Sequence, residues 1–163
     1  DHEMHAELIS VSRSTLLALR EHIGQIIAVG TTSVRTLESL YHLAIALRRQ
    51  PDTPPTALHV EQWLPYEEGA DEELTTEEAL DTLLSYLEAQ GEDTLVFPTS
   101  IIIAPSYHYR VIRGMVTNFH QPHSTLLLLI AALIGDDWHR VYDWALTHDF
   151  RFLSYGDSSL LLP

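Results

Sequence analysis

The stretch Gln25-Ile26-Ile27-Ala28-Val29-Gly30-Thr31-Thr32-Ser33-Val34-Arg35 carries the pattern that decides the fold. Its apolar run Ile-Ile-Ala-Val predicts a strand over residues 25–29, of the kind that lies inside a sheet covered on both faces. From Ser33 to Arg49, apolar residues recur at helical spacing, which predicts a helix. A strand, a glycine turn and a helix in this order form the beginning of a βαβ unit.

Further strands and helices alternate on both sides of this unit. Thr75 and Glu78 have the spacing of a capping box, so we expect a helix that begins there and stops near Gly91. The patterns predict strands over residues 7–12, 59–66, 93–97, 101–104 and 109–117, and further helices over residues 13–22, 124–134 and from Asp136 onward. This alternation predicts an α/β fold, with a mostly parallel sheet flanked by helices, in which residues 1–163 form a single domain.

The composition is that of a globular protein. With 163 residues, of which 45% are apolar, the chain is large enough for one well-formed core. It contains no cysteine, which excludes a disulfide framework and thiolate chemistry and is compatible with a cytoplasmic location. The longest apolar run, Leu126 to Ile134, is shorter than the roughly 20 residues of a membrane span, so we expect a buried helix there. The opening residues do not resemble a signal peptide, and the absence of an initiator Met suggests a piece of a longer protein.

The negative charge is concentrated in the middle of the chain. The formal net charge is −14, and residues 51–100 carry thirteen acidic side chains and no lysine or arginine. All nine cationic side chains of the protein are arginines. Such a segment repels a phosphate backbone, and we interpret it as a solvated helix and loop. Adaptation to high salt is an alternative explanation.

The first candidate site is the turn after the predicted strand. Gly30 allows a sharp turn, after which backbone amides at the start of a helix face outward and favour an anion. Thr31, Thr32 and Ser33 add hydroxyl groups, and Arg35 adds a fixed positive charge. The structural alternative is that Thr32 caps the helix. Neither GxGxxG nor the Walker pattern is present, so the spacing alone does not identify a ligand.

The second candidate site is a polar loop formed by Asn118, His120, Ser124 and Thr125. It follows a predicted strand and precedes a predicted buried helix, so we expect it at the carboxyl end of the sheet, where open α/β sheets bind ligands. His120 has an ordinary pKa close to neutral pH and can transfer protons. In the structural alternative, Asn118 bonds its own backbone and Ser124 caps the helix.

The third candidate site is the segment Ser154-Tyr155-Gly156-Asp157. Tyr155 can stack on a base, and Asp157 can accept hydrogen bonds from a base or a ribose. The structural alternative is an edge strand followed by a tight turn.

A fourth possibility is a metal site. His2, His5 and Glu7 have a spacing that suits metal ligands, and His120 and His123 are possible partners. Ten histidines make such patterns easy to find by accident, and neither HExxH nor a cysteine ligand is present. We therefore expect no metal.

Taken together, four separated motifs resemble one family, the S-adenosylmethionine:tRNA ribosyltransferase-isomerases of queuosine biosynthesis. The family patterns are His-x-Met-His-x-Glu, Ala-Val-Gly-Thr-Thr-Ser-x-Arg-x-Leu-Glu, Thr-Asn-Phe-His-x-Pro-x-Ser-Thr-Leu-Leu and Tyr-Arg-Phe-x-Ser-Tyr-Gly-Asp. The matching segments are His2 to Glu7, Ala28 to Glu38, Thr117 to Leu127 and Phe150 to Asp157. The chain departs from the family at Ser106, Gln121 and Phe150, where Gly, Leu and Tyr are usual.

The resemblance implies a substrate pair and a fold. Family members transfer the ribosyl moiety of S-adenosylmethionine to a 7-aminomethyl-7-deazaguanine base in tRNA, and epoxyqueuosine forms as adenine and methionine leave. S-adenosylmethionine is consumed as a cosubstrate, no metal is needed, and a cytoplasmic monomer is expected. The chain would be the C-terminal α/β part of a larger two-domain enzyme whose β-barrel part is missing.

The resemblance also implies roles for the motif residues. His120 or His5 would move protons, with Glu7 orienting His5. The residues expected to bind the substrates are Gly30, Thr31, Thr32, Ser33, Arg35, Asn118, Ser124, Thr125, Tyr155 and Asp157. We expect this chain alone to be inactive and most tRNA contacts to lie in the missing half. A nucleotide-binding module without catalysis and a His/Glu metal hydrolase are the alternatives.

Overall fold

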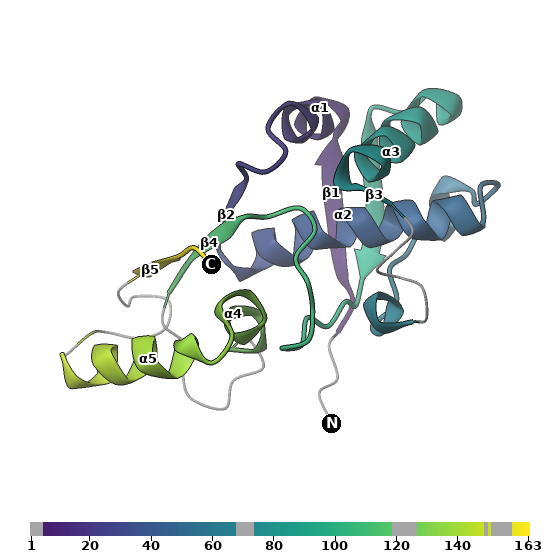
Figure 1. Ribbon diagram of the computed structural model, residues 1–163. Helices are drawn as coiled ribbons and strands as arrows, with labels where there is room; N and C mark the ends of the chain where they lie inside the picture. The colour runs from purple at the N-terminus through teal and green to yellow at the C-terminus, as the bar shows by residue number, and fades with distance from the viewer. Residues whose placement is uncertain (1–4, 68–73, 119–126, 149, 151–157) are drawn as a thin grey trace.

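The computed structural model describes residues 5–67, 74–118, 127–148, 150 and 158–163 (Figure 1). The strands among them are β1 (Glu7–Ser12), β2 (Ile27–Val29), β3 (Thr94–Thr99), β4 (Gly114–Asn118) and β5 (Ser158–Leu161). The α-helices are α1 (Arg13–Glu21), α2 (Thr31–Arg49), α3 (Thr76–Gln90), α4 (Leu127–Ile134) and α5 (Asp137–Thr147), and two short 3₁₀ helices are η1 (Pro55–Ala57) and η2 (Leu64–Tyr66). None of these described helices combines the length and apolar character needed to cross a membrane.

The strands form two small sheets instead of one. β1 pairs with β3 in an antiparallel ribbon, and β2, β4 and β5 form a second sheet in that order. Within the second sheet, β2 and β4 are parallel, and β4 and β5 are antiparallel. The α/β class is therefore confirmed, but a mostly parallel sheet is wrong for the part of the chain that the structure describes. Alternation of strands and helices along a sequence does not fix which strands become neighbours, because that depends on contacts between distant residues.

Two segments predicted as strands have other structures. Residues 59–66 contribute one isolated bridge, between Val60 and Thr99, and then enter η2, where Pro65 removes a backbone donor. Residues 101–104 are buried but belong to no strand. Their backbone is bound by side chains: Arg35 donates to the Ile101 carbonyl at 3.2 Å, and the Tyr66 hydroxyl bonds both the Ile102 carbonyl and the Ala104 amide. A buried apolar run is thus satisfied without a neighbouring strand.

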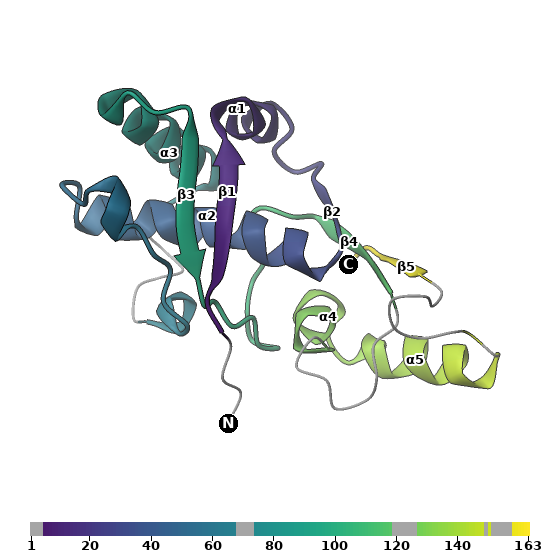
Figure 2. The same cartoon turned by 180° about the vertical axis from the view of Figure 1, so that it is seen from behind.

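Helix α2 lies at the centre of the molecule. Eleven of its nineteen residues are buried, among them Leu40, Tyr41 and Ile45. It packs against α3, and Figures 1 and 2 show it crossing one side of the ribbon of β1 and β3. Ile9 and Val11 of β1 are buried on the side where the core lies. The long helix therefore connects the antiparallel ribbon with the sheet of β2, β4 and β5.

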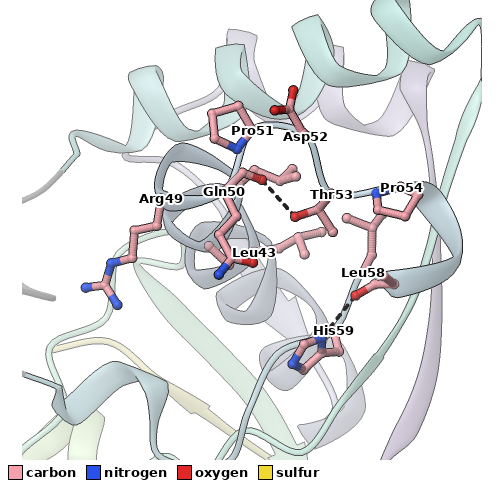
Figure 3. Close-up of a pocket in the computed structure, with 12 residues that line it drawn as sticks. Leu43, Arg49, Gln50, Pro51, Asp52, Thr53, Pro54, Leu58 and His59 are labelled. Carbon is pink, nitrogen blue, oxygen red and sulfur yellow. Dashed lines mark hydrogen bonds between the residues drawn. The ribbon is translucent and has the colours of Figure 1, made fainter.

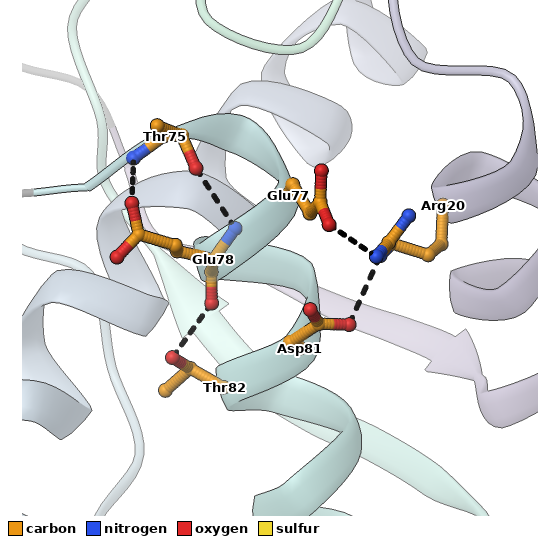
Figure 4. A network of polar contacts seen from close by, with 6 residues as sticks. All are labelled: Arg20, Thr75, Glu77, Glu78, Asp81 and Thr82. Carbon is orange, nitrogen blue, oxygen red and sulfur yellow. Dashed lines mark hydrogen bonds and ion pairs between the residues drawn. The ribbon is translucent and has the colours of Figure 1, made fainter.

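Helix α3 confirms the predicted start and stop signals. The Thr75 hydroxyl accepts from the Glu78 amide, and the Glu78 carboxylate accepts from the Thr75 amide, as a capping box requires (Figure 4). Gly91 ends the helix with a left-handed φ of 66°.

The acidic surface of α3 is partly paired with arginines from other helices. Arg20 of α1 contacts the carboxylates of Glu77 at 2.6 Å and Asp81 at 3.0 Å (Figure 4). Arg49 of α2 contacts Glu67 at 2.7 Å in the preceding loop. These carboxylates are exposed, as expected of a solvated helix and loop, and arginines distant in sequence also pair with them.

Candidate functional site

The Gly30 turn, Asn118 and Ser158 lie at one end of the second sheet. Because β2 and β4 are parallel, the residues that follow them leave the sheet at the same end, and the Gly30 amide donates to the Val116 carbonyl at 2.7 Å. Strand β5 runs in the opposite direction, so its first residue, Ser158, pairs with Asn118 at the end of β4. The Ser158 hydroxyl donates to Asn118 Oδ1 at 2.8 Å. Figure 1 shows this end of the sheet beside the start of α2.

The start of α2 is not capped by a side chain. Gly30 is the N-cap, with a φ of 87°, and the helix itself begins at Thr31. The alternative in which Thr32 caps the helix is therefore wrong, since Thr32 is the second helical residue. The amides of Thr31, Thr32 and Ser33 precede the first intrahelical bond, from the Val34 amide to the Gly30 carbonyl. These three amides and the positive end of a nineteen-residue helix form a place where an anion is favoured.

The end of β4 supplies polar groups to the same place. Asn118 is half-buried, and Thr117 before it is buried. Val116 of β4 pairs with Val29 of β2. Asn118 lies two residues after Val116, so it is level with the turn that follows Val29. An amide side chain and a hydroxyl, from Asn118 and Ser158, therefore lie at the same end of the sheet as the start of α2.

Five of the predicted site residues lie outside the described residues: His120, Ser124, Thr125, Tyr155 and Asp157. The described residues next to them in the chain limit where their segments begin and end. The polar loop starts after Asn118 and ends before Leu127, at the start of α4. The third segment ends immediately before Ser158, which contacts Asn118.

The buried Arg35 forms an ion pair with the partly exposed Glu7. The Arg35 side chain is almost completely buried, and its Nη1 donates to the Glu7 carboxylate. Its Nη2 donates to the Ile101 carbonyl at 3.2 Å, while its Nε has no hydrogen-bond partner within the described residues. The anion that Arg35 binds in this structure is thus a carboxylate of the protein itself. Glu7, expected to orient His5, is oriented toward Arg35.

His5 is exposed at the beginning of the described chain, two residues before β1. No group of three or more histidine, aspartate or glutamate side chains suited to a metal ion occurs in the described ranges. Three of the histidines in the metal hypothesis, His2, His120 and His123, lie outside these ranges.

A buried carboxylate at Glu38 was missed by reasoning from the sequence. It is completely buried and accepts four hydrogen bonds, from the Tyr107 hydroxyl at 2.7 Å and from the backbone amides of Arg110, Val111 and Ile112 at 2.7, 2.9 and 3.0 Å. Burial raises the pKa of Glu38 above its ordinary value, and the hydrogen bonds act in the opposite direction. The signal in the sequence is a charged residue one helical turn after Val34 and one turn before Tyr41, two apolar positions of the predicted helix.

A cavity lies elsewhere, at the opposite end of α2 (Figure 3). It has a volume of about 630 Å³, a floor that includes Leu43 and Leu58, and a rim formed by the loop from Gln50 to Pro54. His59 at this rim has its pKa raised, first by a hydrogen bond to the Ala57 carbonyl. None of the predicted site residues lines this cavity.

Comparison with known proteins identifies relatives along the whole chain. A family model described as "Queuosine biosynthesis protein" matches residues 1–161. Two curated proteins, from Rhizorhabdus wittichii and Novosphingobium aromaticivorans, are each 36% identical over 171 aligned residues that cover all of this chain. A protein from Brucella ovis is 35% identical and covers 99% of it. All three are named S-adenosylmethionine:tRNA ribosyltransferase-isomerase.

A solved structure supports the same relationship. The crystal structure of S-adenosylmethionine tRNA ribosyltransferase from Thermotoga maritima superposes with a TM-score of 0.60 at 28% sequence identity. The match covers 95% of this chain and 40% of that one. The chain likewise spans 36% of the length of the first two curated relatives.

Proposed function

Because the chain belongs to the family of queuosine biosynthesis proteins, we propose that it forms part of a site that transfers the ribosyl moiety of S-adenosylmethionine to a 7-aminomethyl-7-deazaguanine base in tRNA. Adenine and methionine leave, and epoxyqueuosine is the product. The observation that carries this proposal is the convergence of Gly30, Asn118 and Ser158 at one end of a sheet. Ligands bind at such ends in open α/β folds.

The described part of the site suits the polar ends of S-adenosylmethionine. The amides of Thr31 to Ser33 favour an anion, and we assign them the methionine carboxylate. Asn118 is placed to hydrogen-bond a ribose hydroxyl, together with Ser124, Thr125 and Asp157 from the adjoining segments. Tyr155 is assigned to stack on a base. Binding the cosubstrate at several fixed polar groups orients it for reaction.

The reaction also requires proton transfer. It needs a base near the 5′ carbon that the sulfonium activates and an acid for the departing adenine. His120 is assigned these proton transfers because it lies two residues after Asn118, and histidine exchanges protons near neutral pH. His5 is the second candidate. Glu7 is assigned a supporting role through Arg35.

Arg35 is assigned a role inside the protein instead of on the substrate. Its two contacts, to Glu7 and to Ile101, occupy a side chain that is almost completely buried. A ligand anion would have to displace the Glu7 carboxylate to reach it.

Contacts with tRNA are proposed to come mostly from the part of the longer relatives that this chain does not match. The net charge of −14 opposes a phosphate backbone, and Arg20 and Arg49 are engaged with carboxylates. We also expect the chain to bind S-adenosylmethionine as a monomer and without a metal.

Two measurements on the protein test this proposal. Calorimetric titration with S-adenosylmethionine should show binding at one site, and Gly30→Val should weaken it while the far-ultraviolet circular dichroism stays unchanged. Incubation with S-adenosylmethionine and tRNA that carries the 7-aminomethyl-7-deazaguanine base should release no adenine, whereas a full-length relative releases it. Unchanged binding in Gly30→Val would remove the assigned role of the turn.

A second function is a nucleotide-binding module without chemistry of its own. It is favoured by one finding, that the chain spans 36% of the length of the first two curated relatives. Adenine release by this chain with tRNA would exclude a pure binding module.

A further inference from the structure

We propose that Glu38 is a positioning residue, which fixes the start of α2 relative to β4 and so sets the geometry of the candidate site. The consequence for ligand binding rests on the proposed function, but the positional claim does not. The residues involved are Glu38 in α2 and the irregular segment 107–112, which leads into β4.

The hydrogen bonds around Glu38 use its full accepting capacity. Each carboxylate oxygen has two acceptor positions, and Glu38 Oε1 accepts from the Tyr107 hydroxyl and the Arg110 amide. Oε2 accepts from the amides of Val111 and Ile112. With four donors and complete burial, the carboxylate has no position left for a ligand. Its role is therefore to hold the backbone of residues 110–112.

The direction of these bonds extends the network to His42, one turn further along α2. The Tyr107 hydroxyl has a single proton, which it donates to Glu38. Its oxygen must then accept the contact of 2.9 Å from His42 Nε2, so that nitrogen carries a proton. Two residues of α2, Glu38 and His42, thus contact the same tyrosine.

The held segment connects the elements that form the candidate site. Ile112 is followed by Arg113, whose amide donates to the Ile26 carbonyl at 2.8 Å, and then by β4. Asn118 at the end of β4 belongs to the site, as does Gly30, eight residues before Glu38 in the chain. At a rise of 1.5 Å per residue, Glu38 lies about 12 Å along the helix from the Gly30 turn.

The same segment also fixes α4. The Tyr109 hydroxyl donates to the Leu129 carbonyl in the first turn of α4 at 2.7 Å. Asn118 at the end of β4 and Leu127 at the start of α4 therefore both belong to elements attached to residues 107–112. Displacing this segment should move Asn118, Leu127 and the amides at the start of α2 relative to one another.

Two variants and one matched control test the inference. Glu38→Gln replaces one accepting oxygen by an NH₂ group, which faces N–H or O–H donors and cannot accept from them. Tyr107→Phe removes one hydrogen bond but leaves the carboxylate. Tyr86→Phe is the control, because Tyr86 is also buried and donates a single hydrogen bond of 2.8 Å, to the Thr53 carbonyl, away from the site. The readouts are the backbone amide NMR shifts of Gly30 and Asn118 and the dissociation constant for S-adenosylmethionine.

We expect Tyr107→Phe to shift the Gly30 and Asn118 amides more than Tyr86→Phe does, at comparable losses of thermal stability. Glu38→Gln should shift them further and raise the dissociation constant about tenfold, as loss of a supporting hydrogen-bond partner typically does. Equal shifts in the two tyrosine variants would overturn the inference, and Tyr107→Phe decides it if Glu38→Gln does not fold. If the unaltered protein does not bind S-adenosylmethionine, the proposed function fails, while the amide shifts still decide the role of Glu38.

Discussion

Gly30 and Gly114 lie in the same sheet region but differ in what a β-carbon would meet. At Gly30 a β-carbon has no atom within 4 Å, so the reason for glycine is the φ of 87°, not a lack of space. A side chain in this left-handed region costs about 1–2 kcal/mol. At Gly114 a β-carbon would lie 2.6 Å from the Leu161 carbonyl and 2.5 Å from a Leu162 methyl group.

We therefore predict different results for alanine at these two glycines. Gly30→Ala should lower the free energy of unfolding by about 1 kcal/mol and weaken S-adenosylmethionine binding, because the strained turn misplaces the amides that follow. Gly114→Ala should lower stability more, because β5 has to move. Urea unfolding measures both, and a larger stability loss at Gly30 would contradict the prediction.

The buried Arg35 leads to a second prediction at this scale. From the sequence we expected Arg35 to bind the substrates. In the structure the side chain bonds Glu7 and the Ile101 carbonyl, so Arg35→Ala leaves a buried acceptor without a partner. Glu7 is 43% exposed and remains hydrated, which limits the loss to about 2 kcal/mol. Chemical denaturation measures this loss, and Glu7→Gln, which keeps the side-chain size, should cost less.

Among the elements, α3 has the ends that depend most directly on local sequence. Thr75→Ala should lower the free energy of unfolding by about 1 kcal/mol, because the Glu78 amide at the start of the helix loses its partner. Thr82→Ala is the matched control: its hydroxyl bonds the Glu78 carbonyl within the same helix, so alanine should be tolerated. Thermal unfolding compares the two variants, and equal losses would show that the capping box is not the cause.

Sequence predicted the elements with local signals and failed where distant residues decide. Helix α2 was expected from Ser33 to Arg49 and runs from Thr31, and both ends of α3 were anticipated from Thr75 and Gly91. Residues 101–104 have the composition of a buried strand, but side chains from α2 and η2 bind their backbone. The sequence of residues 101–104 itself does not indicate that Arg35 and Tyr66 bind their backbone.

In the candidate site, too, the features set by local sequence were predictable and those set by distant residues were not. A glycine after an apolar run was enough to predict the turn at Gly30 and its position beside Asn118. The role of Glu38 was not predictable, because its four donors come from residues more than sixty positions away. Arg35 was assigned to a ligand for the same reason, since its partner Glu7 is distant in the sequence.

The molecule as a whole should lose stability in alkali. Burial raises the pKa values of Tyr66, Tyr86, Tyr107 and Tyr109 above their ordinary value of 10.0. The folded chain therefore binds more protons than the unfolded chain above pH 10, and its stability falls as the pH rises further. Absorbance at 295 nm should show these four tyrosines ionising together with unfolding, and Tyr107→Phe should remove one of them. Ionisation of all tyrosines near pH 10 in a folded protein would contradict this.

The pairing of β2 with β4 has a consequence for when the candidate site forms during folding. Strand β2 pairs residues 27–29 with residues 114–116 of β4, and β4 pairs in turn with residues 158–161. Contacts between such distant parts of a chain form slowly, whereas helices form early. In refolding from urea, helical circular dichroism should therefore recover before S-adenosylmethionine binding. During synthesis, residues up to 161 must leave the ribosome before the site can assemble.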